Sequence, residues 1–263
     1  MITAAVIGGG LTLFAALERR HPLRGRVESQ ALRTGRNAAL GTTALVVSTI
    51  LQTALAPPVS RWSARRRAGV VRLLKLKRPL DTMASVALLD YTLWIWHWAN
   101  HRLPLLWRFH LVHHIDLDLD ASTALRFHFG EMALSALFRA LQVIIIGPTR
   151  EALSIWQNML FASILFHHSN LRLPPHVERL LALIVVTPRM HGIHHSTRAD
   201  ETNSNWASLL SLWDRMHGTY RMNVPDDAIV IGVPAFQKEA EVTLGRMLAL
   251  PFVRQRDDWG AKT

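Results

Sequence analysis

The stretch "WHWANHRLPLLWRFHLVHH", from Trp96 to His114, places five histidines within eighteen residues, directly after an apolar run that is compatible with a membrane helix. His97 and His101 are four residues apart, so on a helix they project from the same face one turn apart. Spacings of three and four recur in the last three histidines, which are His110, His113 and His114. The stretch therefore predicts helices that present imidazole rings at the mouth of an apolar bundle.

The HxxHH spacing returns far along the chain in "HGIHH", which contains His191, His194 and His195. One isolated histidine is most simply a satisfied polar residue, but eight in three motifs favour metal binding. Imidazole is the commonest metal ligand, and burying many unpaired imidazoles would cost desolvation energy. Eight to ten histidines exceed the need of one tetrahedral ion, so the count favours two ions with open positions, and imidazole suits iron, zinc or copper.

The composition predicts a membrane protein, because 49% of the 263 residues are hydrophobic. Four runs are largely uncharged and compatible with helices, and some of them fall just short of the roughly 20 residues that a straight span needs, which suggests hairpins, tilting or half-spans. They are Ala38 to Pro57, Ala84 to Trp98, Met132 to Gly147 and Ala152 to Phe166. The first run, Ile2 to Leu17, lacks the basic lead of a signal peptide and is interpreted as a retained anchor.

We expect an all-α integral membrane bundle of about four membrane helices or helical hairpins, with a histidine-rich cytoplasmic metal-binding cap. One domain is expected over residues 1–263, with anchor helices and basic loops in 1–80, the histidine core in 81–220 and a polar cap in 221–263. "GPTRE", from Gly147 to Glu151, predicts a turn between two apolar helices. "AIVIGVP", near the C-terminus, resembles a short strand.

Absence of cysteine rules out disulfides, thiolate zinc sites and iron–sulfur clusters held by this chain. The net charge of +11 comes mainly from two basic clusters that flank the Ala38 to Pro57 run. They are Arg19, Arg20, Arg24, Arg26, Arg33 and Arg36, and then Arg61, Arg65, Arg66, Arg67, Arg72, Lys75, Lys77 and Arg78. Both cannot be cytoplasmic if the run crosses fully. Either the run dips in and returns, or the second cluster lies along the interface. Such clusters favour a lipid partner over a nucleic acid.

The predicted helix after "RFHFGE" carries polar residues at spacings of four, four and three, which align them on one face. They are Glu131, Ser135, Arg139 and Gln142. A charge deep in a membrane helix is costly unless it faces protein or water, so this face should point inward toward the histidines. The alternative is a shallow helix from which Arg139 reaches the headgroups. Arg139 or Arg126 could hold a lipid headgroup.

In this order, HxxxH, HxxHH, a middle histidine and HxxHH resemble the fatty acid hydroxylase superfamily, particularly its sterol desaturase branch. The resemblance covers roughly Leu88 to Tyr220 and includes "TALRFHFGE", "FHHSN", "HGIHHS" and "NSNWASLLSLWDRMHGTY". There are two departures. The family's usual Phe-Gly-Thr reads His217-Gly218-Thr219 here, and its Asn-Tyr-Gly reads Asn205-Trp206-Ala207.

This resemblance implies a membrane-bound non-haem diiron oxygenase that hydroxylates or desaturates a lipid with O₂ and external electrons. It implies two iron ions, for which zinc may substitute in purified protein. By motif, the metal role falls on His97, His101, His110, His113, His114, His128, His168, His191, His194 and His195. Whether His167 or His168 binds is left open, and His21 and His176 match no motif.

Histidine ligands need outer partners that accept the other ring N–H. Asp90 is the first candidate, because it lies seven residues before His97 and so on the same helical face. The other candidates are Glu131, Asp200, Glu201, Asp214, Asn170 and Asn205. No further catalytic residue and no organic cofactor site are expected, and Gly8 to Gly10 lack the context of a nucleotide loop.

The expected partners are a membrane lipid and an electron-donor protein, a reductase with a cytochrome b5-like or ferredoxin-like carrier. A multi-pass protein of a bacterial inner membrane or endoplasmic reticulum is expected, with the histidines facing the cytoplasm. Two other functions remain open, a zinc-dependent membrane hydrolase that activates water and a metal-binding or metal-transport protein.

Overall fold

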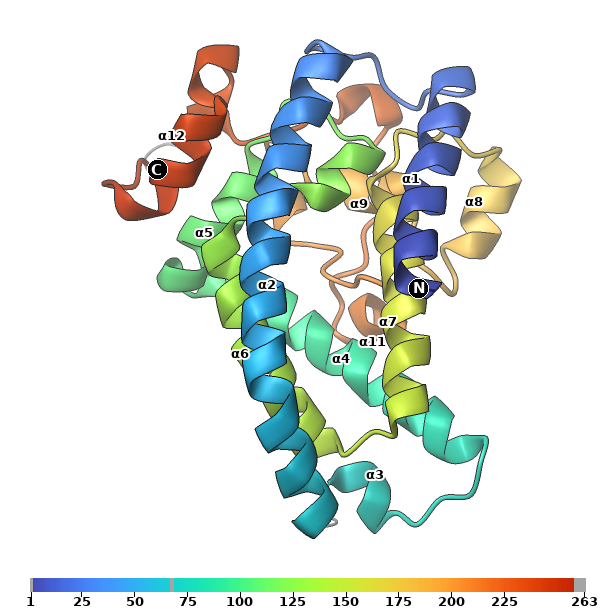
Figure 1. The fold of residues 1–263 in the computed structure, drawn as a ribbon. Coiled ribbons are helices and arrows are strands. Elements are labelled where there is room, and N and C mark those ends of the chain that lie inside the picture. The colour runs from blue at the N-terminus through green and yellow to red at the C-terminus, as the bar shows by residue number, and fades with distance from the viewer. Residues whose placement is uncertain (1, 67–68, 258–263) are drawn as a thin grey trace.

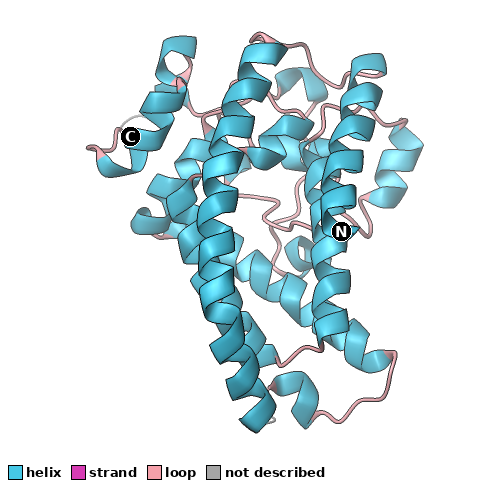
Figure 2. Ribbon diagram, viewed as in Figure 1, coloured by secondary structure: helices cyan, strands magenta, loops and turns pink. Residues whose placement is uncertain are grey.

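The structure is a computed structural model that describes residues 2–66 and 69–257. Within these residues every regular element is helical, and the β pairing consists of three isolated antiparallel bridges (Figure 2). The strand-like "AIVIGVP" contributes only one of them, between Ile231 and Ser196, so the expectation of a strand there is wrong. The predicted all-α class is confirmed.

Four long helices form two packed pairs, with a fifth helix between them. α1 (Ile2–Arg20) packs along α7 (Arg150–His168), and α2 (Gln30–Arg66) packs along α6 (Phe129–Ile146). α4 (Leu80–Arg102) contacts α6 on one side and α7 on the other, and it runs obliquely between the pairs (Figure 1). The first histidine motif is therefore carried by the helix that both pairs contact.

α2 is one continuous helix of 37 residues, which is about 55 Å long at 1.5 Å per residue. The expectation that this run dips in and returns is therefore wrong, and the second basic cluster begins at the far end of α2. Arg67 lies outside the described residues, as do the side chains of Arg65 and Arg66. The interfacial placement of this cluster stays a prediction.

Two segments of the described chain are long and apolar enough to cross a membrane: residues Gln30–Val59 of α2, and α6. α4 and α7 match predicted apolar runs but do not reach the same combination of length and hydropathy. By length and hydropathy the described residues thus contain two candidate spans, fewer than the expected four or so. Both spans expose large apolar side chains, which are Leu45, Val46 and Ile50 on α2 and Leu137, Leu141 and Ile145 on α6.

The turn predicted at "GPTRE" separates α6 from α7. Gly147 ends α6 in the left-handed conformation with φ of 70°, which glycine adopts without a steric penalty. Thr149 then caps α7 by accepting a hydrogen bond from the backbone N–H of Ala152. A Cβ at Gly69 would come within 2.5 Å of the Gly147 Cα, so the chain just before α3 (Val70–Leu73) passes directly against this turn.

The polar face predicted on α6 points into the protein. Ser135 accepts a hydrogen bond from the Trp96 indole N–H at 3.1 Å, and Gln142 donates hydrogen bonds to α4. The Arg139 guanidinium lies over the Trp156 ring of α7, 4.3 Å from its centroid. Arg139 therefore contacts protein as predicted, and the alternative in which it reaches the headgroups is wrong.

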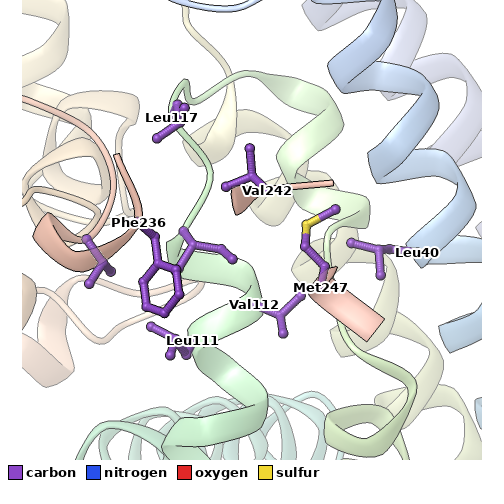
Figure 3. Packing of buried hydrophobic residues seen from close by; sticks show 9 residues of the cluster. Leu40, Leu111, Val112, Leu117, Phe236, Val242 and Met247 are labelled. Carbon is purple, nitrogen blue, oxygen red and sulfur yellow. The ribbon is translucent and has the colours of Figure 1, made fainter. Parts of the chain in front are cut away.

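The remaining helices are short, and the first of them, α3, lies beside the turn between α6 and α7 (Figure 1). They are α3 (Val70–Leu73), α5 (Pro104–His114), η1 (Ala121–Leu125), α8 (Pro175–Leu181), α9 (Pro188–His194), α10 (Ala199–Thr202), α11 (Leu212–Met216), η2 (Asp226–Ala228), η3 (Pro234–Phe236), η4 (Glu239–Glu241), α12 (Leu244–Ala249) and η5 (Leu250–Phe252). Figure 3 shows one buried apolar cluster in which Leu40 of α2 and Leu111 of α5 meet Phe236 and Met247. The C-terminal segment is thus packed onto the helix that carries the second histidine motif.

A buried charge network fixes the start of α2 to the segment after α5. The Arg33 guanidinium donates to Asp116 at 2.9 Å and also to Asp120, and all three side chains are almost fully buried. Arg126 donates to the Asn37 side-chain oxygen at 3.0 Å and lies 3.5 Å from Asp116. Arg126 is fully buried among these partners. The suggestion that it holds a lipid headgroup is therefore wrong.

Candidate metal centre

Five imidazoles from three helices meet in one group, in which the potential ligand nitrogens all lie within 4.8 Å of one another. They are His97 and His101 of α4, His110 and His114 of α5, and His194 of α9. All but His101 are buried, and His101 is half-buried. The first group therefore joins all three histidine motifs.

A second group of four buried imidazoles meets the same distance criterion. Its members are His113 of α5, His168 at the end of α7, and His191 and His195 at the end of α9. The rings of His114 and His195 stack with their centroids 4.3 Å apart and their planes 12° apart. This stacked pair joins the two groups, so they adjoin inside one buried volume.

Each HxxHH motif divides its histidines between the two groups. On α5, His110 and His114 are four residues apart and point into the first group, whereas His113 points into the second. The third motif is divided in the opposite sense, since His191 and His195 belong to the second group and His194 to the first. Residues four apart on a helix lie one above the other, and the histidine between them faces another direction. The HxxHH spacing therefore supplies ligands to both groups from a single helix.

Backbone carbonyls fix the tautomer of four rings. Their Nδ1 atoms contact carbonyl oxygens: His97 with Trp206 at 2.7 Å, His113 with Arg126 at 3.0 Å, His168 with Ile164 at 2.8 Å, and His194 with Ser204 at 2.8 Å. A carbonyl oxygen can only accept a hydrogen bond, so Nδ1 must carry the proton in each ring. Nε2 of each ring is then left with a lone pair that is available to a metal.

These lone pairs face one another, which is the arrangement that a bound cation would stabilise. Nε2 of His97 lies 3.1 Å from Nε2 of His194, and neither atom has a proton to donate. The same holds for Nε2 of His113 and Nε2 of His168, which are also 3.1 Å apart. The buried Nε2 of His101 has no hydrogen-bond partner. Because all nine donors are imidazole nitrogens, the site fits iron, zinc or copper and is unsuited to magnesium or calcium.

Burial keeps five of the histidines at α5 and α9 neutral. It holds the pKa values of His113, His114, His191 and His195 well below the usual range, and neighbouring imidazoles lower them further. The pKa of His194 falls to about 3 for the same main reason, burial. Protons therefore do not compete with a metal for these nitrogens at neutral pH.

Acid should destabilise the metal-free protein. In the unfolded chain a histidine takes up a proton at about pH 6.5. In the folded site the buried histidines take up a proton only at a lower pH than this. Below about pH 6.5 the unfolded state therefore binds more protons than the folded state does. The free energy of unfolding has its highest value above that pH and decreases as the pH is lowered. We expect the melting temperature of chelator-treated protein in detergent to decline steadily as the pH is lowered from about 7 to 4. A melting temperature that stays constant over this interval would contradict the buried neutral site.

The model of the fatty acid hydroxylase family matches residues 82–219, more than half of the chain, and this range contains every histidine of both groups. The chain belongs to the fatty acid hydroxylase family. The predicted resemblance is thereby confirmed. The sterol desaturase-like branch is supported by the relatives described next.

Three curated relatives show what kinds of protein the chain is similar to. Alkylglycerol monooxygenase of Danio rerio is 31% identical over 61% of this chain and 34% of its own length. Ornithine lipid hydroxylase OlsE of Rhizobium tropici is 28% identical over 83% of this chain and 61% of its own length. Cholesterol 25-hydroxylase of Mus musculus is 27% identical over 53% of this chain and 46% of its own length. The chain thus spans between about a third and three fifths of these relatives. No solved structure matches it.

Within this family fold, Glu131 is the one predicted outer partner that contacts a ring of either group directly. Its Oε1 lies 2.9 Å from Nδ1 of His110, and the other carboxylate oxygen is buried without a hydrogen-bond partner. A carboxylate in this position orients the ring and increases its basicity as a ligand.

Replacing Glu131 with Gln should weaken metal binding while leaving the fold intact, because the amide keeps the shape but not the charge. We expect a loss of about 10- to 100-fold in affinity at one of two sites, measured by competition with a chromogenic chelator. Ser135→Ala is the matched control, since Ser135 lies one turn further along the same face of α6 and contacts Trp96 instead of a histidine. Equal affinities in the two variants would contradict the assigned role.

Asp90 does not contact His97, so the first candidate among the outer partners is wrong. Its Oδ2 accepts hydrogen bonds from the backbone N–H of Leu210 and the indole N–H of Trp213. Seven residues return a helix to nearly the same face, but they also advance it by about 10 Å along the axis. Asp90 shares the face of His97 and is too far along the helix to reach it.

The remaining acidic and amide candidates for outer partners contact backbone groups or arginines, and not the histidine rings. Asp214 accepts hydrogen bonds from the backbone N–H groups of Trp206 and Ala207, and so holds the loop whose carbonyl binds His97. Asn205 donates to the Met190 carbonyl of α9. None of the other predicted partners contacts a histidine of either group in the described chain: Glu201 and Asp200 pair with Arg198 and Arg221, and Asn170 pairs with the backbone of Arg24.

Of the ten predicted metal ligands, only His128 lies outside both groups. It caps the start of α6, where its Nδ1 accepts from the backbone N–H of Gly130 and its Nε2 faces the Leu248 carbonyl. His168 lies in the second group, whereas His167 is buried beside it with its ring 4.1 Å from that of His191. His21 and His176 are exposed.

Sequence reasoning missed the carbonyl acceptors of Trp206, Arg126, Ile164 and Ser204. Every residue has a backbone carbonyl, so no residue type marks these positions. The one signal that the sequence offered is that Ser204 and Trp206 lie in the "NSNW" segment, which belongs to the motif resemblance described above.

Proposed function

We propose that this chain is a membrane-bound non-haem diiron oxygenase that hydroxylates a lipid with O₂ and external electrons. The observation that carries the proposal is the division of nine inward-facing imidazoles into adjoining groups of five and four. One iron would be held by His97, His101, His110, His114 and His194, and the other by His113, His168, His191 and His195.

The chemistry that such an iron pair supplies is the reductive activation of O₂ for attack on an unactivated C–H bond. The residues of the chain supply position and a dry environment. Carbonyl contacts hold the rings of His97, His113 and His194 in the tautomer that presents Nε2 inward. Because nearly all of these rings are buried, bulk water is kept from the ligand nitrogens.

A lipid substrate is supported by the names of the relatives, which act on alkylglycerols, ornithine lipids or cholesterol. All three are named as hydroxylases or monooxygenases, which favours hydroxylation over desaturation. The exposed apolar side chains of α2 and α6 would face the bilayer and let a lipid approach from its side. The substrate would therefore be a membrane lipid, and the product analysis described below would identify its headgroup.

Electrons would come from a separate carrier protein, a reductase with a cytochrome b5-like or ferredoxin-like partner. The chain has no cysteine with which to hold an iron–sulfur cluster of its own. A carrier in the aqueous phase needs access to the histidine end of the bundle. We therefore propose that this end faces the cytoplasm of a bacterial inner membrane or the cytoplasmic side of an endoplasmic reticulum.

The test combines metal content with product analysis. Protein purified anaerobically should contain about two irons per chain, as the two ligand groups require, and should consume O₂ after reduction. Lipid extracts from cells with and without the gene should differ by one hydroxylated species, with ether glycerolipids, ornithine lipids and sterols examined first. Zinc-containing protein that hydrolyses lipids without consuming O₂ would overturn the proposal in favour of the hydrolase.

A further inference from the structure

Two positions where the sequence departs from the family pattern belong to one aromatic stack beside the first histidine group. His217 stands where the family usually has Phe, and Trp206 stands where it usually has Tyr. In the structure both rings contact Trp94, at centroid distances of 4.1 Å and 5.9 Å. Neither departure is explained by metal binding, because neither side chain belongs to a ligand group.

The outer end of the stack consists of three nearly parallel rings. The His217 ring is stacked with Trp94 at an interplanar angle of 15° and with Tyr91 at 10°, with the Tyr91 centroid 5.7 Å away. Tyr91 and Trp94 are themselves 6.3 Å apart at 11°. The Tyr91 hydroxyl lies 3.1 Å from Nε2 of His217 and can donate a hydrogen bond to it. His217 itself is exposed at the surface. A phenol that can pass its proton to an imidazole therefore lies at the surface end.

The inner end of the stack reaches the metal ligands. The Trp206 ring lies 6.3 Å from the ring of His101, and the Trp206 carbonyl accepts from Nδ1 of His97. Trp206, Trp94 and Tyr91 thus form a chain of oxidisable rings from the histidine site to the surface, with every step 6.3 Å or shorter between centroids.

Charges along the chain favour movement of positive charge outward. The Arg102 guanidinium lies 5.5 Å from the centroid of the Trp206 ring, which disfavours a positive charge on that indole. The Trp94 indole N–H instead donates to the buried carboxylate of Asp214 at 2.9 Å, which stabilises a positive charge on Trp94. Tyrosine and tryptophan side chains readily lose electrons but do not readily gain them. The chain of rings is therefore suited to carry oxidising equivalents out, and not to bring reducing electrons in.

We propose that Tyr91, Trp94 and Trp206 form a relay that removes oxidising equivalents from the histidine site when no lipid is bound; this rests on the proposed oxygenase function. One electron passes from Tyr91 through Trp94 and Trp206 to an oxidant of the peroxide class, formed at the site from O₂ or supplied as hydrogen peroxide, and this oxidant is thereby reduced by one electron. The O–H bond of Tyr91 breaks, its proton forms an N–H bond at Nε2 of His217, and a neutral tyrosyl radical remains. A reductant of the ascorbate or hydroquinone class returns the electron at the surface, and the proton returns from His217.

The chain is well suited to a direct test, because it contains only two tyrosines, Tyr91 and Tyr220, and no cysteine that would trap a radical. Iron-loaded, lipid-free protein is treated with hydrogen peroxide, frozen within the reaction time and examined by electron paramagnetic resonance. We expect a tyrosyl signal that Tyr91→Phe abolishes and that Tyr220→Phe retains. Tyr220 is the matched control because its ring packs against Arg215, at 3.7 Å, instead of against a histidine.

His217→Phe restores the usual family residue and keeps an aromatic ring in the stack while removing the proton acceptor. It should lose most of the tyrosyl signal and shift oxidative damage, mapped by peptide mass spectrometry, toward Trp94 and Trp206. An undiminished signal in Tyr91→Phe, or no tyrosyl signal in protein that still hydroxylates lipid, would overturn the relay alone. A Tyr91 radical in protein that oxidises no lipid would leave the relay standing and count against the oxygenase function.

Discussion

Replacement of His194 with alanine is expected to abolish lipid hydroxylation and to lower the iron content. His194 is the one ligand that α9 contributes to the first group, and its ring is held by the Ser204 carbonyl. Loss of an outer partner of a metal ligand costs about 10- to 100-fold in affinity or activity, so loss of the ligand itself should cost at least about 100-fold. Iron per chain is measured by mass spectrometry of the metal, and the product is measured in lipid extracts.

Two other histidines serve as controls for this variant. His176→Ala removes an exposed ring and should change neither iron content nor product. His128→Ala separates the structure from the motif resemblance, because the ring caps α6 outside both groups. We expect His128→Ala to retain both irons. Full iron and full activity in His194→Ala would exclude His194 from the metal site.

Replacement of Asp116 with asparagine should be the most destabilising single change outside the histidine site. Burial alone would raise the pKa of Asp116, but Arg126 and Arg33 overcome this and hold the pKa below its usual value. The carboxylate is therefore charged, and its removal leaves two buried guanidinium groups short of a partner. Breaking a buried pair in this way costs about 3–5 kcal/mol, which we expect to appear as a large drop in the melting temperature in detergent and a low yield from membranes.

An exposed ion pair provides the contrast for Asp116→Asn. Arg78 and Glu151 are 2.7 Å apart, but both side chains are more than half exposed. Exposed pairs contribute about 0–1 kcal/mol, so Glu151→Gln should leave the melting temperature nearly unchanged. Equal shifts in the two variants would show that the buried network does not hold the start of α2 in place.

The spacing of the histidines predicted much of the site, because helical periodicity is a local property. HxxxH and HxxHH place eight rings on known faces of α4, α5 and α9, and the structure brings all eight, together with His168 of α7, into two groups. His128 shows the limit of that reasoning. A match to a motif gives the residue type at a position but does not say where its side chain points. The ring of His128 caps the start of α6 and does not point into either group.

Tertiary features were predicted less well, since they depend on distance along an axis and on backbone groups. Asp90 shares a face with His97 yet lies two turns away, and its carboxylate is taken by Trp213. The apolar run in α2 was correctly predicted as helical, but its continuity through Pro57 and Pro58 could not be read from composition. Packing against α6 favours the straight helix over a hairpin.

Because α5 and α9 each supply ligands to both histidine groups, a change in either helix can affect both groups. A single inserted residue in α9 would turn every later side chain by about 100°, so His194 and His195 would leave different groups at the same moment. An insertion in α9 ahead of His194 would therefore disrupt both ligand groups together, whereas substitution of one histidine would disrupt only one of them.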